Sequence, residues 1–109
     1  MEINMIYISG PITGCDDFQV RFAKAQAELE KRGQKVVNPS LMNLVMPEAT
    51  YEQYMSIDLA LMDMCSAVLM LNGWEKSHGA TMEYGYAMGK DMIILFEKDL
   101  GELKCTTQQ

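Results

Sequence analysis

A short polar segment from Ser77 to Gly85 separates an apolar run from a helical pattern. The apolar run, residues 66–71, is typical of a strand covered on both faces of a parallel sheet. Glu83 falls in the second turn of the helix that follows, just beyond the carboxyl end of that strand, where open α/β sheets bind their ligands. Backbone N–H groups and a carboxylate then meet in one small space, which suits chemistry on a nucleotide. The alternative is that Glu83 is a solvated helix glutamate.

A second carboxylate, Asp58, lies within a helix expected from Tyr51 to about Cys65, on the side that should face the core. An unpaired carboxylate there is costly, so Asp58 either faces a cleft or is satisfied by backbone amides or a lysine. Two carboxylates in one pocket are what cleavage of a glycosidic bond requires. One acts at the anomeric carbon and the other serves proton transfer or substrate orientation, and their environments should push their pKa values apart.

The elements that must position these groups alternate between strand and helix, which predicts a small doubly wound parallel sheet with right-handed crossovers. We expect one domain over residues 1–98 and a C-terminal tail over residues 99–109. The helix after Gly79 should end with Gly89 as its cap. The connection at residues 38–50 has room for one helical turn around Leu41 to Leu44 and is either a lid or a loop. The expected strands are residues 4–9, 35–37, 66–71 and 92–96, and the first helix runs from near Asp16 to Gly33.

Composition excludes several classes of partner. A chain of 109 residues with a net charge of −6 and scattered basic residues does not suit a nucleic acid polymer. No apolar run is long enough to cross a membrane, and the start lacks the features of a signal peptide. Cys15, Cys65 and Cys105 have unrelated spacings, which predicts a reducing, cytoplasmic location without disulfides.

The single histidine, His78, gives no support for a metal site, and no cofactor is expected. His78 contacts the substrate or is an exposed loop residue. Its neighbour Ser77 caps the following helix or contacts a phosphate, and these two roles are compatible.

Three separated segments together carry a resemblance: residues 7–12, residues 58–68, and residues 73–80 with Glu83. In order and spacing they resemble the nucleoside 2-deoxyribosyltransferase-like superfamily, and most closely its small phage and bacterial members of the DUF4406 type. The resemblance extends from Met5 to Phe96. It implies a flavodoxin-like or Rossmann-like three-layer α/β sandwich with a parallel sheet of four to five strands.

The resemblance implies cleavage of the N-glycosidic bond of 2′-deoxynucleosides or their 5′-monophosphates, by hydrolysis or by transfer to another base. Glu83 matches the nucleophile that attacks C1′, and Asp58 matches an aspartate associated with the sugar or with proton transfer. Tyr7 matches a tyrosine that positions the nucleophile, and Ser77 matches a serine that contacts a 5′-phosphate. The remaining candidates for substrate contact are Ser9, Gly10, Pro11, Ile12, Trp74, His78 and Gly79.

Two positions depart from the pattern of relatives. Ser66 replaces an aspartate that many of them carry, and the loop from Gly10 to Asp17 lacks an arginine found in some nucleotide hydrolases. Phosphate affinity would then depend on backbone amides and Ser77. Members of the superfamily tend to form homodimers or larger homo-oligomers, which suits so short a chain.

Two other functions fit the same residues. A non-catalytic nucleotide-binding module would use the Gly10 loop and the helix start at Ser77 without needing a nucleophile. An interaction protein would use faces rich in the eleven methionines and would have no nucleotide affinity.

Overall fold

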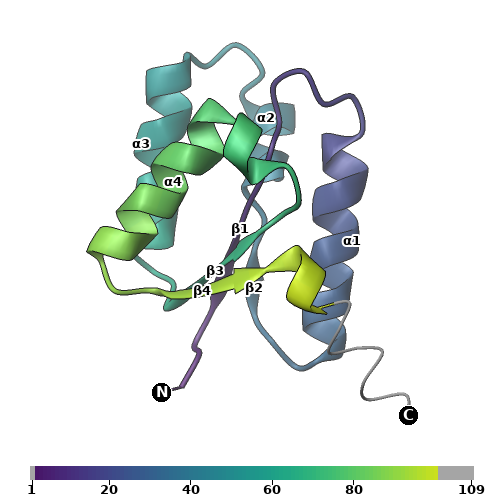
Figure 1. The fold of residues 1–109 in the computed structure, drawn as a ribbon. Coiled ribbons are helices and arrows are strands. Elements are labelled where there is room, and N and C mark those ends of the chain that lie inside the picture. The colour runs from purple at the N-terminus through teal and green to yellow at the C-terminus, as the bar shows by residue number, and fades with distance from the viewer. Residues whose placement is uncertain (1, 101–109) are drawn as a thin grey trace.

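A computed structural model describes residues 2–100, which form a parallel sheet with helices on both faces (Figure 1). Within this range the sheet has four strands in the order β2-β1-β3-β4, the order of the first four strands in flavodoxin-like folds. All neighbouring strands are parallel. The strands are β1 (Ile6–Ser9), β2 (Val36–Val37), β3 (Ala67–Met70) and β4 (Ile93–Phe96).

Helices cover both faces of this sheet, as the expected three-layer sandwich requires. Helix α1 packs on one face, and α3 and α4 lie on the other (Figure 1). None of the helices in residues 2–100 combines the length and apolarity needed to span a membrane. The helical elements are α1 (Phe18–Lys31), η1 (Pro39–Leu41), α2 (Met42–Val45), α3 (Tyr51–Met62), η2 (Trp74–Lys76) and α4 (His78–Gly89).

Alternation along β1 divides its side chains between the two layers. Ile6 and Ile8 pack against Phe22 of α1, whereas Tyr7 belongs to the core under α3 and α4. Because side chains alternate along a strand, Ser9 points to the same face as Tyr7. The β1 sequence therefore presents two hydroxyl groups to the α3–α4 layer, and all four residues of the strand are buried.

The chain leaves β1 through Gly10, which lies very close to the end of β3. A Cβ atom at this position would come within 2.8 Å of the Cβ of Leu71, so any larger residue would push the loop away from the sheet. This close approach fixes where the loop after β1 begins, at the carboxyl edge of the sheet.

The connection between β2 and α3 is more regular than the sequence suggested. The helical turn expected around Leu41 to Leu44 is present as α2, and η1 precedes it. Thr50 and Gln53 then form a capping box that starts α3, in which each side chain accepts a hydrogen bond from the other's backbone N–H. The predicted end of this helix near Cys65 is wrong, because α3 ends at Met62 and the chain turns there to enter β3.

The ends of α1 and α4 share one backbone motif with different residues. After α1, the N–H groups of Gly33 and Gln34 bind the carbonyls of Glu30 and Leu29, and Gly33 has φ +83°. These two bonds define a Schellman motif, which requires a left-handed residue.

The same motif after α4 corrects the predicted glycine cap. Gly89 is the last residue of the helix itself, and the left-handed position belongs to Asp91, with φ 56°. The N–H groups of Asp91 and Met92 bind the carbonyls of Met88 and Ala87. Aspartate tolerates this conformation better than most residues but less well than glycine.

The predicted C-terminal tail lies mostly outside the described residues. Residues 97–100 form a helical turn, and Leu100 packs against the α1 side of the core. The carbonyl of Leu100 also accepts a hydrogen bond from Arg32 at 3.1 Å. Cys105 falls in the part that is not described.

Replacing Asp91 with glycine should stabilise the protein by about 0.5–1 kcal/mol, because glycine adopts the left-handed conformation without a Cβ clash. The converse change, Gly33→Asp, should destabilise it by a similar amount. Urea unfolding of the two variants measures both effects. A loss of stability in Asp91→Gly would contradict this account of the α4 terminus.

Candidate active site

Glu83 is a buried carboxyl group held by two hydroxyl groups of β1. The phenol of Tyr7 donates a hydrogen bond to its Oε2 at 2.9 Å, and the hydroxyl of Ser9 donates to its Oε1 at 2.6 Å. Only 5% of Glu83 is exposed. Each carboxyl oxygen therefore has a donor from the strand, which fixes the side chain in one orientation.

The start of α4 explains why Glu83 faces the sheet. Ser77 caps the helix by accepting a hydrogen bond from the N–H of Ala80 at 3.1 Å. With the helix beginning at His78, Ala80, Glu83 and Ala87 share its buried side at spacings of three and four residues. A buried position flanked by alanines leaves room for the carboxyl group to reach β1.

Asp58 approaches the same place from α3. Its side chain is half-buried and interacts with both Glu83 and Tyr7. The helix that carries it packs beside α4, so the two carboxyl groups come from adjacent helices of one layer. The structure thus brings together the three residues predicted to be catalytic, Tyr7, Asp58 and Glu83.

These three groups lie at a cavity of about 300 Å³, at the lower end of the range for small-molecule sites. The loop after β1, the η1–α2 segment, α3 and the start of α4 all contribute to its wall. The lining residues are Tyr7, Ile8, Gly10, Ile12, Thr13, Phe22, Pro39, Asn43, Ala49, Tyr51, Tyr54, Met55, Asp58, Ser77, Gly79, Ala80 and Glu83.

Burial raises the pKa of Glu83 to about 8 from its ordinary value of 4.5. The hydrogen bond from Ser9 opposes this change, the negative charge of Asp58 adds to it, and the bond from Tyr7 opposes it again. Burial also raises the pKa of Asp58, while its interactions with the side chains of Glu83 and Tyr7 lower it. For Tyr7, burial and the two carboxylates raise the pKa well above its ordinary value, so the phenol stays a hydrogen-bond donor.

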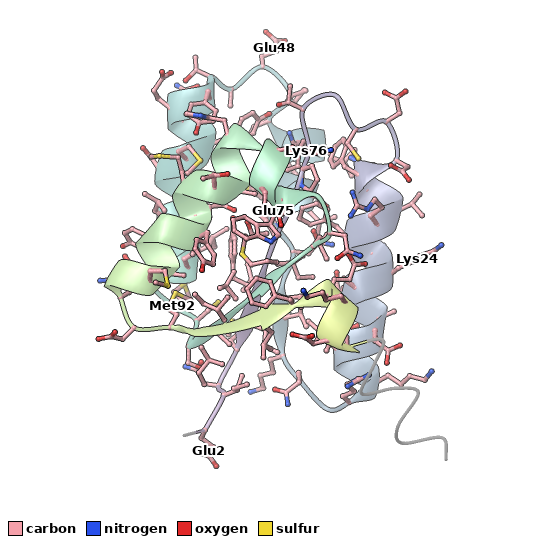
Figure 2. The ribbon with its side chains drawn as sticks, viewed as in Figure 1. Glu2, Lys24, Glu48, Glu75, Lys76 and Met92 are labelled. Atoms are coloured by element: carbon pink, nitrogen blue, oxygen red, sulfur yellow. The ribbon has the colours of Figure 1, made fainter. Side chains whose placement is uncertain are left out.

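No lysine or arginine contributes to the cavity wall within the described part of the chain. Lys24, for example, extends outward from α1 (Figure 2). Among residues 2–100 there is also no group of three or more His, Cys, Asp or Glu side chains arranged to hold a metal ion. Among the described residues, the carboxyl groups that line this cavity are those of Asp58 and Glu83.

Several residues proposed for substrate contact line the cavity, and others do not. Gly10, Ile12, Ser77 and Gly79 are in its wall. The remaining four are not part of this wall. Ser9 donates a hydrogen bond to Glu83, and Pro11 lies beside Gly73. The ring of Trp74 stacks on that of Tyr84 with centroids 4.5 Å apart, and the centroids of the His78 and Tyr51 rings are 5.4 Å apart.

Sequence reasoning missed two kinds of residue at this site. Thr13 and Asn43 line the cavity from connections whose path the sequence did not specify. Ser9 was assigned to the substrate, whereas its hydroxyl binds Glu83. The signal for Ser9 was present in the sequence, since Tyr7 and Ser9 are two residues apart on one strand and must share a face.

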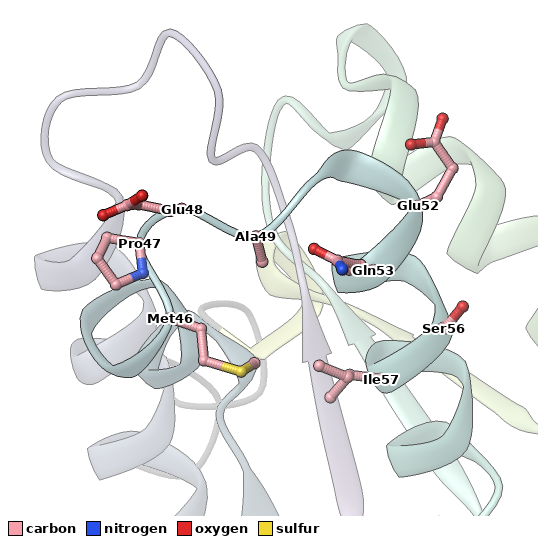
Figure 3. A pocket seen from close by; sticks show the side chains of 8 residues that line it. All are labelled: Met46, Pro47, Glu48, Ala49, Glu52, Gln53, Ser56 and Ile57. Carbon is pink, nitrogen blue, oxygen red and sulfur yellow. The ribbon is translucent and has the colours of Figure 1, made fainter.

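A second hollow of about 680 Å³ borders the connection into α3 (Figure 3). Met46 and Ile57 point toward each other across it, and Glu48 and Glu52 lie at its rim. It shares Ala49 with the cavity described above and has neither Asp58 nor Glu83 in its wall.

The fold and this site define a small parallel α/β domain with a paired-carboxyl cavity at the carboxyl edge of its sheet. The chain belongs to the DUF4406 family, described as a domain of unknown function, whose model matches residues 4–96. That match covers all four described strands and both carboxyl groups. No curated protein matches the chain significantly.

The raised pKa of Glu83 predicts that stability falls as the pH rises from about 5 to about 8. In this range the folded protein retains a proton that the unfolded chain, ionising near 4.5, has lost. The loss over this interval should be about 3–4 kcal/mol. Glu83→Gln, which mimics the protonated form, should remove most of it.

Chemical unfolding at several pH values measures this slope. Glu75→Gln is the control, because it removes an exposed carboxyl group of η2, and it should keep the wild-type slope. An unchanged slope in Glu83→Gln would contradict the assignment.

Proposed function

We propose that this protein cleaves the N-glycosidic bond of 2′-deoxynucleosides or their 5′-monophosphates, with Glu83 as nucleophile. The observation that carries the proposal is the buried Glu83 carboxyl, held by Tyr7 and Ser9 at a ligand-sized cavity beside Asp58. A fixed carboxylate with restricted access to water suits attack on a sugar carbon.

In the first step a Glu83 oxygen forms a bond to C1′ while the bond from C1′ to the base nitrogen breaks. The bonding electrons leave with the base, which takes a proton from Asp58 or from bound water. In the second step water or another nucleobase attacks C1′ and releases the Glu83 carboxylate. Hydrolysis and base exchange share the first step and differ only in the second.

The resemblance to the nucleoside 2-deoxyribosyltransferase-like superfamily supports the substrate class. Glu83, Asp58 and Tyr7 are the positions that match its nucleophile, its helix aspartate and its positioning tyrosine. These three side chains are mutual neighbours in the structure.

Ser77 supports acceptance of a 5′-monophosphate. It lies in the cavity wall at the N-terminus of α4, where backbone N–H groups and the helix dipole favour an anion. Its oxygen already accepts the N–H of Ala80, and a hydroxyl that accepts one hydrogen bond can still donate another.

The proposal also covers the location of the protein and its oligomeric state. Cys15 and Cys65 are free thiols, which suits a reducing cytoplasm. Leu44, Val45 and Met82 are large apolar residues that are at least half exposed, and their burial between copies would favour a homodimer or larger homo-oligomer.

Glu83→Ala should abolish base release while leaving the fold intact, because the bond-forming atom is removed. Chromatography after incubation with each deoxynucleoside and each 5′-monophosphate, with and without a second base, measures release and exchange. Glu75→Ala, which removes an exposed glutamate, is the matched control and should retain wild-type turnover.

Full activity in Glu83→Ala would refute the proposal. Tight binding of unmodified nucleotides by the wild type without any base release would assign a binding module instead.

The value of kcat/KM should rise with pH toward about 8, because it reports ionisation of the free protein, Glu83 must be ionised to attack, and the pKa of Glu83 lies near that value. A pH series of initial rates measures this. If the rate instead falls through the same interval, Glu83 acts as a general acid and the assignment of nucleophile is wrong.

A further inference from the structure

We propose that Ser9 is a positioning residue for Glu83. Its hydroxyl holds the nucleophile from outside the cavity wall and does not contact the substrate. This inference depends on the proposed function for its kinetic consequences. Its structural basis is the 2.6 Å hydrogen bond from the Ser9 hydroxyl to Oε1 of Glu83.

The two donors to Glu83 occupy different places. Tyr7 is part of the cavity wall, and its phenol binds Oε2. Ser9 is only 1% exposed and is not part of that wall, although its neighbours Ile8 and Gly10 are. A ligand in the cavity therefore meets Glu83 and Tyr7, while Ser9 contacts the carboxyl group from within the protein.

Two donors from one strand hold a carboxylate more firmly than one. With both oxygens bound, rotation of the carboxyl plane would break at least one hydrogen bond, so the group keeps one orientation toward the cavity. Because Tyr7 and Ser9 are fixed on β1 by pairing with β3, the orientation of Glu83 is tied to the sheet.

The Ser9 hydrogen bond also opposes the effect of burial on Glu83, which is the largest influence on the pKa of this group. Burial raises the pKa of Glu83, and the bond from Ser9 is the strongest effect that lowers it. Donation to the charged form favours the carboxylate that attack requires. Ser9 therefore contributes both geometry and charge stabilisation.

Three substitutions separate these contributions from packing. Ser9→Ala removes the donor, Ser9→Cys keeps a group of similar shape with a weak donor, and Ser9→Thr restores a hydroxyl. Ser40→Ala is the matched control, because Ser40 is also 1% exposed but its hydroxyl binds Asn38 rather than Glu83.

The first readout needs no activity. Carbon-13 NMR of labelled glutamate carboxyls, with the Glu83 signal assigned by its loss in Glu83→Gln, follows ionisation of this group in the free protein. We expect Ser9→Ala to raise the pKa of Glu83 by about one unit, with Ser9→Cys intermediate and Ser9→Thr near wild type. Ser40→Ala should leave it unchanged.

The second readout is steady-state kinetics. Ser9→Ala should lower kcat about tenfold and leave KM unchanged, because the lost interaction involves the nucleophile rather than the bound substrate. Ser9→Thr should recover most of the rate. The acid side of the pH profile should move upward in Ser9→Ala in parallel with the NMR titration.

The outcomes distinguish this inference from the proposed function. An unchanged Glu83 titration in Ser9→Ala overturns the role of Ser9, whatever the activity. A rise in KM at constant kcat overturns it as well and makes Ser9 a substrate contact. Full turnover in Glu83→Gln would instead refute the nucleophile, while the NMR result would still decide whether Ser9 holds the carboxyl group.

Discussion

The hydrogen bonds from β1 to Glu83 are the interaction on which the site depends. A carboxyl group with 5% exposure is costly to bury, and Tyr7 and Ser9 make it tolerable by donating to both of its oxygens. The donors can do so only because β1 is buried, lies in the middle of the sheet and presents alternate side chains to the α3–α4 layer. The sheet order and the start of α4 therefore determine together how Glu83 is held.

Asp58 affects the protonation state of Glu83. Its charge raises the pKa of Glu83 beyond the effect of burial, so the two carboxyl groups together favour the binding of one proton. In the proposed reaction, departure of the base requires a proton, whereas attack by Glu83 requires that its own carboxyl group be ionised. Because the higher pKa belongs to Glu83, attack in the proposed reaction requires that the proton shared by the pair move from Glu83 to Asp58, which then supplies it to the base.

The sequence was sufficient to predict the parallel sheet, the three layers and the three residues that converge. Apolar runs, the glycine after α1 and the periodicity of α3 and α4 are local signals, and the structure agrees with them. Asp91 shows where local signals fail. Because glycine favours the left-handed conformation, Gly89 was predicted to be the helix cap. The structure instead places that conformation two residues later, at Asp91. Trp74 likewise looked like a ligand contact from its place in a motif, but its ring stacks on Tyr84. The spacing of Tyr7 and Ser9 was enough to place both on one face of β1, but the bond from Ser9 to Glu83 also depends on which helix covers that face, and this is set by tertiary packing.

The central claim, that Glu83 attacks the sugar, is tested most directly by peptide mass spectrometry of protein quenched in acid during turnover with a deoxynucleoside or its 5′-monophosphate. The account predicts a deoxyribosyl group, or its 5′-phosphate, on the peptide that contains Glu83, and no such adduct in Glu83→Gln. Base release without any adduct on Glu83, or with the adduct on Asp58, would contradict it.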